Sequence, residues 1–149
     1  MLQLCHTDAQ IATIIGHEVG HVVARHTVER ITNQLWIFIL QLILYSFFMP
    51  KIFNKMWSLL LRRFLSRRME IEADYIGLIL LASAGYDPRA APKLYKKFQR
   101  ITGDSTIFST HPSGNKRAEF LAQTQVMEEA LTIYKNARAG RGFNAQIPL

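Results

Sequence analysis

The sequence predicts a single, mainly α-helical domain with an apolar helical hairpin inserted near its middle. Its 149 residues suit one domain with a hydrophobic core of its own. Hydrophobic residues make up 49% and charged residues 19%, which argues against a disordered chain. Apolar residues recur at helical spacing through most of the sequence. No charged residue occurs between Arg30 and Lys51, which marks the insert.

The first helix is expected to begin at Asp8 and to run past His26. Thr7 and Gln10 have the T-x-x-Q spacing of a capping box, with Thr7 as the N-cap. Gly16 and Gly20 each lower helix stability by about 1 kcal/mol relative to alanine. Because they share one face of the helix, we expect a second backbone to approach closely there.

The apolar insert covers residues 31–61. Its first piece ends at Pro50, and its second piece, residues 52–61, contains Lys55. Residues 31–50 have the length that a transmembrane helix needs. A basic run follows the insert: Arg62, Arg63, Arg67 and Arg68.

Three further helices are expected after the basic run. The first carries three acidic residues and ends at Gly85, a candidate C′ residue. The second begins at Asp87-Pro88 and continues to about residue 101. Residues 103–109 read as a loop, with a short extended piece at 106–108. The last helix runs from Pro112-Ser113 to about residue 137. Residues 1–138 therefore form one domain, and residues 139–149 form a flexible tail.

The net charge of +7 permits a nucleic acid or an anionic membrane surface as partner. The apolar insert favours the membrane surface, and no aromatic-and-basic RNA-binding signature is present. The one cysteine, Cys5, cannot form an internal disulfide and is expected to be a bystander.

The segment His17-Glu18-Val19-Gly20-His21 has the spacing of a metal site. Residues four apart on a helix lie about 40° apart around its axis, so both imidazoles can reach one ion. Glu18 can reach a water molecule beside that ion. A metal with an adjacent carboxylate base is the minimum equipment for hydrolysing a peptide bond. His26 lies about 140° further round a continuous helix and is expected to be an ordinary surface histidine.

A catalytic zinc site has three protein ligands, so a third must come from elsewhere. Glu70 and Asp74 share a helix face, whereas Glu72 points the other way. Glu70 as a ligand would bring Asp74 with it, and a carboxylate there can accept the N–H of a ligating histidine. The alternative is that all three acids pair with the neighbouring arginines on a solvated face. Spacing alone does not decide between the two.

Three blocks in this order carry a family resemblance. They are His17-Glu18-x-x-His21, residues 66–77 around Glu70, and Ser109-Thr110-His111-Pro112 followed by Arg117. Together they resemble the zinc metalloendopeptidase family of the CaaX prenyl protease and the bacterial HtpX protease, over roughly residues 7–121. The likeness is greatest to its mitochondrial inner-membrane stress proteases, whose activity overlaps that of the m-AAA protease. The resemblance implies a gluzincin-type zinc metallopeptidase catalytic domain, mainly α.

The resemblance also implies a role for individual residues. One zinc ion per chain would be held by His17, His21 and Glu70, with Glu18 as the catalytic base. Asp74 would orient a ligating histidine.

The third block is less defined. The resemblance places His111 and Arg117 near the active site, where His111 would stabilise the oxyanion or orient substrate. His111 could also be a simple loop residue. Arg117 could instead anchor the helix of Glu70 or another carboxylate.

The metal ligands constrain the insert. A single membrane crossing would place His21 and Glu70 on opposite sides of the bilayer, and residues 52–61 are too few for a second crossing. A re-entrant or membrane-resting hairpin with arginines at the headgroups is therefore favoured. The alternative is a buried helical hairpin in a soluble core.

The resemblance implies proteolysis of membrane-associated proteins in mitochondrial inner-membrane quality control. Partners would be protein substrates and the membrane but no nucleic acid, and a homo-oligomer is left open. Family members carry an anchor and substrate-binding strands before this region, so the chain is expected to be N-terminally truncated. Two alternatives are a pseudo-peptidase or regulatory fragment, and a membrane-bound helical assembly protein with an accidental HExxH.

Overall fold

The computed structural model describes residues 5–47, 51–102 and 113–140, with only the backbone described at residues 44, 45, 47 and 51–63. All regular structure in these ranges is helical, which confirms the predicted class. The helices are α1 (Asp8–Val23), α2 (His26–Phe47), α3 (Lys51–Ser83), α4 (Ala90–Thr102), α5 (Gly114–Leu121) and α6 (Thr124–Arg138). The predicted loop at 103–109, His111 and tail residues 141–149 lie outside the described residues.

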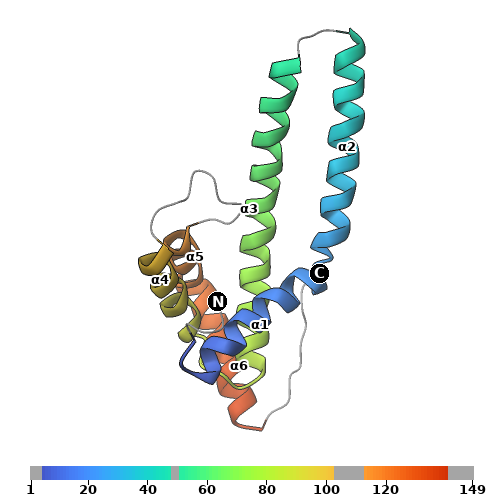
Figure 1. Ribbon diagram of the computed structural model, residues 1–149. Coiled ribbons are helices and arrows are strands. Elements are labelled where there is room, and N and C mark those ends of the chain that lie inside the picture. Colours follow the sequence, from blue (N-terminus) through green and yellow to red (C-terminus); the bar gives the residue numbers. More distant parts are fainter. Residues whose placement is uncertain (1–4, 48–50, 103–112, 141–149) are drawn as a thin grey trace.

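A long hairpin stands away from a helical body (Figure 1). The hairpin consists of α2 and the first half of α3, and the body contains α1, the second half of α3 and the three later helices. The second apolar piece, the basic run and the acidic segment, which the sequence suggested as separate units, form one continuous helix of 33 residues. The hairpin and the acidic segment therefore share a rigid element.

Two helix boundaries follow the expected local signals. The Oγ1 of Thr7 accepts a hydrogen bond from the N–H of Gln10 at 3.3 Å, which confirms the N-cap of α1. The side chain of Gln10 accepts from the N–H of His6 at 2.9 Å. Gly85 has φ +80°, and the N–H of Tyr86 donates to the carbonyl of Leu81, as expected after the end of α3.

The predicted continuation of the first helix past His26 is wrong. Helix α1 ends at Val23, Arg25 has a positive φ of 54°, and α2 begins at His26. The break changes the direction of the chain, and the side chain of His26 becomes buried, with 2% exposure. The buried imidazole of His26 contacts His21 and Glu72, which offsets the cost of removing this polar group from water.

The prediction of a single last helix is also wrong, because α5 and α6 are separated by a turn at Ala122 and Gln123. Leu121 and Ala130 both lie in the hydrophobic core. Nine residues apart on a straight helix, they would point to opposite sides of its axis. The turn lets both side chains face the core.

The core lies between the second half of α3 and helices α4, α5 and α6. It is formed by Leu78, Leu81, Ala82, Ala91, Leu94, Tyr95, Phe98, Ala118, Leu121 and Ala130. This packing fixes α4 and α5 against the segment of α3 that carries the acidic residues.

Helix α1 packs directly on α3 through glycine. A Cβ on Gly16 would lie 2.8 Å from the carbonyl oxygen of Gly77, and one on Gly20 would lie 2.6 Å from that of Ala73. These distances are too short for any real Cβ, so the two backbones touch. The expected close approach at Gly16 and Gly20 is confirmed.

No helix in the described part of the chain combines enough length and apolarity to cross a membrane. The apolar side chains of α2 nevertheless lie largely outside the core, with Trp36 64% and Phe38 60% exposed. Seven more large apolar side chains of α2 are exposed: Val28, Ile31, Leu35, Ile39, Leu40, Leu42 and Ile43. These positions do not fit a hairpin buried in the core of this chain.

Gly20→Ala is expected to destabilise the fold. The substitution gains about 1 kcal/mol of helix propensity, but the overpacking against α3 costs about 1–3 kcal/mol. Urea unfolding followed by circular dichroism measures the net effect. Val22→Ala is the matched control, because Val22 is 76% exposed on the same helix. A Gly20→Ala chain more stable than wild type would contradict the direct backbone contact.

Candidate metal centre

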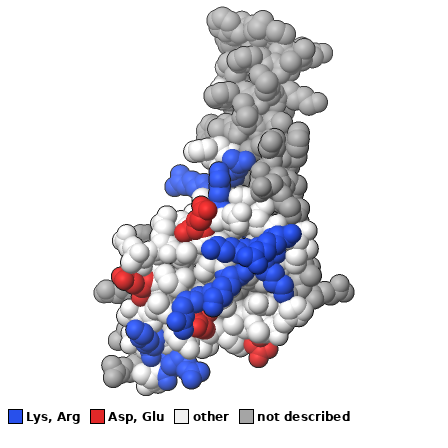
Figure 2. All heavy atoms as spheres, turned by 90° about the vertical axis from the view of Figure 1, so that its left-hand side faces the viewer, with Lys and Arg blue, Asp and Glu red and all other residues white. Residues whose placement is uncertain are grey.

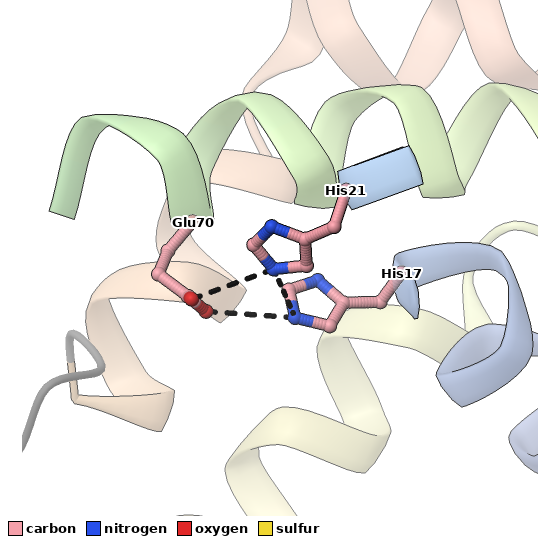
Figure 3. Close-up of side chains that lie close together, drawn as sticks. All are labelled: His17, His21 and Glu70. Carbon is pink, nitrogen blue, oxygen red and sulfur yellow. Dashed lines mark hydrogen bonds and ion pairs between the residues drawn. The ribbon is translucent and has the colours of Figure 1, made fainter. Parts of the chain in front are cut away.

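Three side chains from two helices converge on one point (Figure 3). His17 and His21 come from α1, and Glu70 comes from α3. The two Nε2 atoms are 3.2 Å apart. Oxygens of Glu70 lie 3.5 Å from the Nε2 of His17 and 3.4 Å from that of His21. Among the described residues, these three form the group that could hold a metal ion.

The spacing of the donor groups fits zinc. Ligands at 2.0–2.1 Å from a tetrahedral zinc ion lie roughly 3.3 Å from one another. The two Nε2 atoms are 3.2 Å apart, and each faces a different carboxylate oxygen of Glu70, Oε2 at 3.5 Å from His17 and Oε1 at 3.4 Å from His21. One donor atom from each residue lies within 4.8 Å of the other two. Two imidazoles and one carboxylate are also a ligand set that suits zinc. The residues present therefore fit the ion.

Glu18 is accessible to solvent. It directly follows His17 in α1 and is exposed, whereas His17 and Glu70 are buried. The negative charge of Glu18 acts on His21 and opposes the lowering of the pKa of His21 by burial. An accessible carboxylate in this position can exchange protons with a water molecule at the site.

A buried polar network supports His17 from behind. Asp74 is 2% exposed, and its Oδ1 lies 3.0 Å from the Nδ1 of His17. Arg117 donates to both oxygens of Asp74, at 2.7 and 2.5 Å. The hydroxyl of Tyr95 donates to Oδ1 of Asp74 at 2.8 Å, and the guanidinium of Arg117 stacks on the Tyr95 ring. With both its oxygens engaged, Asp74 is held in one orientation toward His17.

The network shifts the pKa values of its members. Burial lowers the pKa of His17, but hydrogen bonds to Asp74 and Glu70 outweigh it and raise this pKa to about 9. Burial lowers the pKa of His21 below its usual value. Burial alone would raise the pKa of Asp74, but Arg117 and His17 hold it below its usual range.

The structure decides between the two readings of the acidic segment. Glu70 turns toward the histidines, and Asp74 pairs with Arg117 of α5 rather than with an arginine of its own helix. Glu72 is 51% exposed, and its Oε2 lies 3.5 Å from the Nε2 of His26. The prediction that His26 points away from His21 is wrong, because their Nδ1 atoms lie 2.8 Å apart.

Sequence reasoning missed two participants. Tyr95 lies in an amphipathic helix with no motif around it, so no local signal identified it. His26 is brought to His21 only by the helix break. Position 25 is an arginine and not a glycine, so the sequence carries no local signal for that break. His111 lies outside the described residues, and its placement stays a prediction.

A histidine pair on one helix and a glutamate on a second form a group that could hold a metal ion, an arrangement that zinc metallopeptidases use. The chain belongs to peptidase family M48, whose model matches residues 1–125.

The chain is similar to mitochondrial metalloendopeptidases. It is 61% identical to the mitochondrial metalloendopeptidase OMA1 of Arabidopsis thaliana over 91% of the chain and 28% of that protein. It is 34% identical to OMA1 of Schizosaccharomyces pombe over 90% of the chain and 43% of that protein. A more distant relative, 25% identical over 74% of the chain and 26% of its own length, is the β-barrel assembly-enhancing protease of Yersinia pestis. No solved structure matches the chain.

The chain thus spans less than half of the length of each of these relatives. Family membership is established by the matched region.

Zinc binding near pH 7.5 is expected to release about one proton per chain, because a ligating histidine must be neutral and His17 is protonated there in the metal-free chain. The release should fall as the pH rises through about 9. Calorimetry in two buffers with different ionisation enthalpies measures it.

The raised pKa of His17 also determines how the stability of the metal-free chain changes with pH. The pKa of His17 is raised above the unfolded value of 6.5, so its contribution is full below 6.5 and is lost as the pH rises through about 9. The metal-free chain should therefore unfold more readily at about pH 9.5 than at about pH 7. Zinc binding without proton release near pH 7.5 would contradict the protonated state of His17.

Proposed function

We propose that this chain is the catalytic part of a mitochondrial zinc metalloendopeptidase. One zinc ion would be held by His17, His21 and Glu70 in a gluzincin-type arrangement, with two ligands from one helix and one from another. The observation that carries the proposal is the convergence of the two histidine Nε2 atoms, 3.2 Å apart, with the carboxylate oxygens of Glu70 at 3.5 and 3.4 Å, while Glu18, next to His17 in the chain, is accessible to solvent. The domain would comprise residues 1–138, with the hairpin inserted at about 31–61 and a tail at 139–149.

The chemistry divides between the ion and the protein. When bound, zinc supplies a Lewis acid that polarises the scissile carbonyl and makes water more acidic. Glu18 takes a proton from the attacking water and later delivers it to the leaving amine. Asp74 accepts the Nδ1–H of His17 and so keeps the Nε2 lone pair directed at the ligand cluster. Arg117 and Tyr95 hold Asp74 in place.

His111 completes the proposed machinery. It precedes Pro112 in the block that resembles the family, six residues before Arg117. Arg117 itself reaches Asp74 of the ligand network, with a distance of 2.7 Å between its Nε and Oδ2 of Asp74. We assign His111 to hydrogen bonding with the oxyanion or with the substrate.

The proposed substrates are membrane-associated proteins of the mitochondrial inner membrane, cleaved in quality control and stress. The similarity to mitochondrial metalloendopeptidases supports the compartment. The exposed apolar side chains of α2 support the membrane, because soluble proteins rarely expose a contiguous apolar surface of this kind.

The basic residues are placed to meet anionic headgroups. Arg30, Arg67 and Arg68 are exposed near the root of the hairpin. Figure 2 shows Lys and Arg side chains where the hairpin leaves the body and across the face on which α4 lies. A hairpin that rests in the membrane interface would bury the apolar side chains of α2 among the lipids and place the arginines against the anionic headgroups.

Glu18→Gln is expected to retain one zinc per chain and to lower cleavage of an unfolded test protein by at least ~10²-fold, because the general base is removed. His17→Ala should lose both zinc and cleavage. Zinc stoichiometry and cleavage with and without a chelator are the measurements. Full activity of Glu18→Gln would refute the assignment of the base.

The same measurements distinguish the alternatives. A wild-type chain that binds one zinc but does not cleave supports a pseudo-peptidase or regulatory fragment. A chain that binds no zinc supports a helical assembly protein in which HExxH is accidental.

Trp36→Glu is expected to weaken binding to vesicles of phosphatidylglycerol and phosphatidylcholine by at least about tenfold, since burying a large apolar side chain contributes roughly 1.5–3 kcal/mol. Vesicle flotation measures the bound fraction. Ile101→Glu on α4 is the matched control, because Ile101 is 54% exposed but lies outside the hairpin. Equal loss in both variants would argue against the hairpin as the membrane contact.

A further inference from the structure

The break between α1 and α2 places a second histidine behind His21. Helix α1 ends at Val23, and α2 begins at His26 after the left-handed residue Arg25. On an uninterrupted helix His26 would be turned about 140° from His21. The break instead sets the two rings 4.9 Å apart, and His26 is almost fully buried.

A chain of contacts leads from His21 to the surface. The Nδ1 of His21 lies 2.8 Å from the Nδ1 of His26. The Nε2 of His26 lies 3.5 Å from Oε2 of Glu72, which is half exposed. The Nε2 of His21, on the other side of its ring, faces Glu70 and the Nε2 of His17. The Nδ1 of His21 and both ring nitrogens of His26 therefore each face one partner in this chain of contacts.

Only one placement of protons satisfies these contacts and a metal ion together. A neutral imidazole carries one N–H and one lone pair. If the Nε2 of His21 gives its lone pair to a metal, Nδ1 carries the proton and donates it to the Nδ1 of His26. His26 must then hold its own proton on Nε2, the atom that faces the Glu72 carboxylate. The reverse placement would put a proton on the Nε2 of His21 and remove the ligand.

We propose that His26 and Glu72 form a positioning pair that holds His21 in the tautomer able to bind the metal. The inference rests on the proposed zinc site but concerns residues outside the ligand set. It gives each ligating histidine its own support from α3: Asp74 accepts from His17 directly, and Glu72 acts on His21 through His26. Hydrogen bonds to the second nitrogen of a ligating histidine commonly govern its tautomer and metal affinity.

The test compares zinc affinity among variants of the full chain by competition with a chromogenic chelator. His26→Leu should weaken zinc binding 10–100-fold, the usual effect of losing such a partner. His26→Asn should stay within about threefold of wild type, because its Oδ1 can occupy the acceptor position of Nδ1. Glu72→Ala should weaken binding less than His26→Leu. Glu29→Gln, which removes an equal charge from an exposed site on α2, should leave it unchanged.

A second readout separates positioning from a purely structural role. Nitrogen NMR shifts of His21 in the metal-free chain, at a pH where its ring is neutral, report which nitrogen carries the proton. Wild type should show protonated Nδ1, and His26→Leu should show a mixture of tautomers. If His26→Leu fails to fold, Glu72→Ala tests the positioning role instead, because the half-exposed side chain of Glu72 is not part of the core.

The outcomes distinguish this inference from the proposed function. Equal zinc affinity and an unchanged His21 tautomer in His26→Leu and Glu72→Ala would overturn the positioning role while leaving the zinc site intact. Failure of wild type itself to bind zinc would overturn the proposed function.

Discussion

Direct backbone contact between α1 and α3 is the constraint on which the site depends. Gly16 and Gly20 lie against Gly77 and Ala73, so the helices approach as closely as their main chains allow. His17 and His21 each follow one of these glycines by one residue. The close approach therefore brings both imidazoles within reach of Glu70. A side chain at either glycine would separate the helices by a large fraction of an ångström, whereas metal–ligand distances tolerate only about 0.2 Å.

The buried charges around the ligands are stabilised by mutual pairing. An isolated carboxylate with 2% exposure would be strongly unfavourable, but Asp74 receives two bonds from Arg117 and one from Tyr95. Tyr95 and Arg117 come from α4 and α5, which the hydrophobic core fixes against α3. The core therefore acts on the chemistry, because it determines where the supports of Asp74 lie. This explains why a small ligand cluster needs helices distant from it in sequence.

Local patterns predicted the features whose causes are local. The cap at Thr7, the stop at Gly85 and the glycine contact each depend on a few neighbouring residues or one helix face. Spacing left the direction of the acidic segment open, and Glu70 was expected near His17 and His21 only from the family resemblance. The break after Val23 was not predictable in this way, since Arg25 carries no signal for a positive φ. The turn at Ala122 follows from the need of two helices to face one core. The role of Tyr95 follows only from the packing of α4, which brings its hydroxyl to Asp74.

The hairpin and the metal centre share helix α3, and this links their positions. His26 is both the first residue of α2 and the neighbour of His21. Helix α3 runs without interruption from the hairpin to Glu70, Glu72 and Asp74. A helix transmits a displacement along its length because its backbone hydrogen bonds resist bending. A tilt of α2 relative to α3 would therefore change the contact between His26 and Glu72, at the root of the hairpin. The insert is thus anchored next to His21 and Glu70, and its orientation relative to the body bears directly on the geometry of the site.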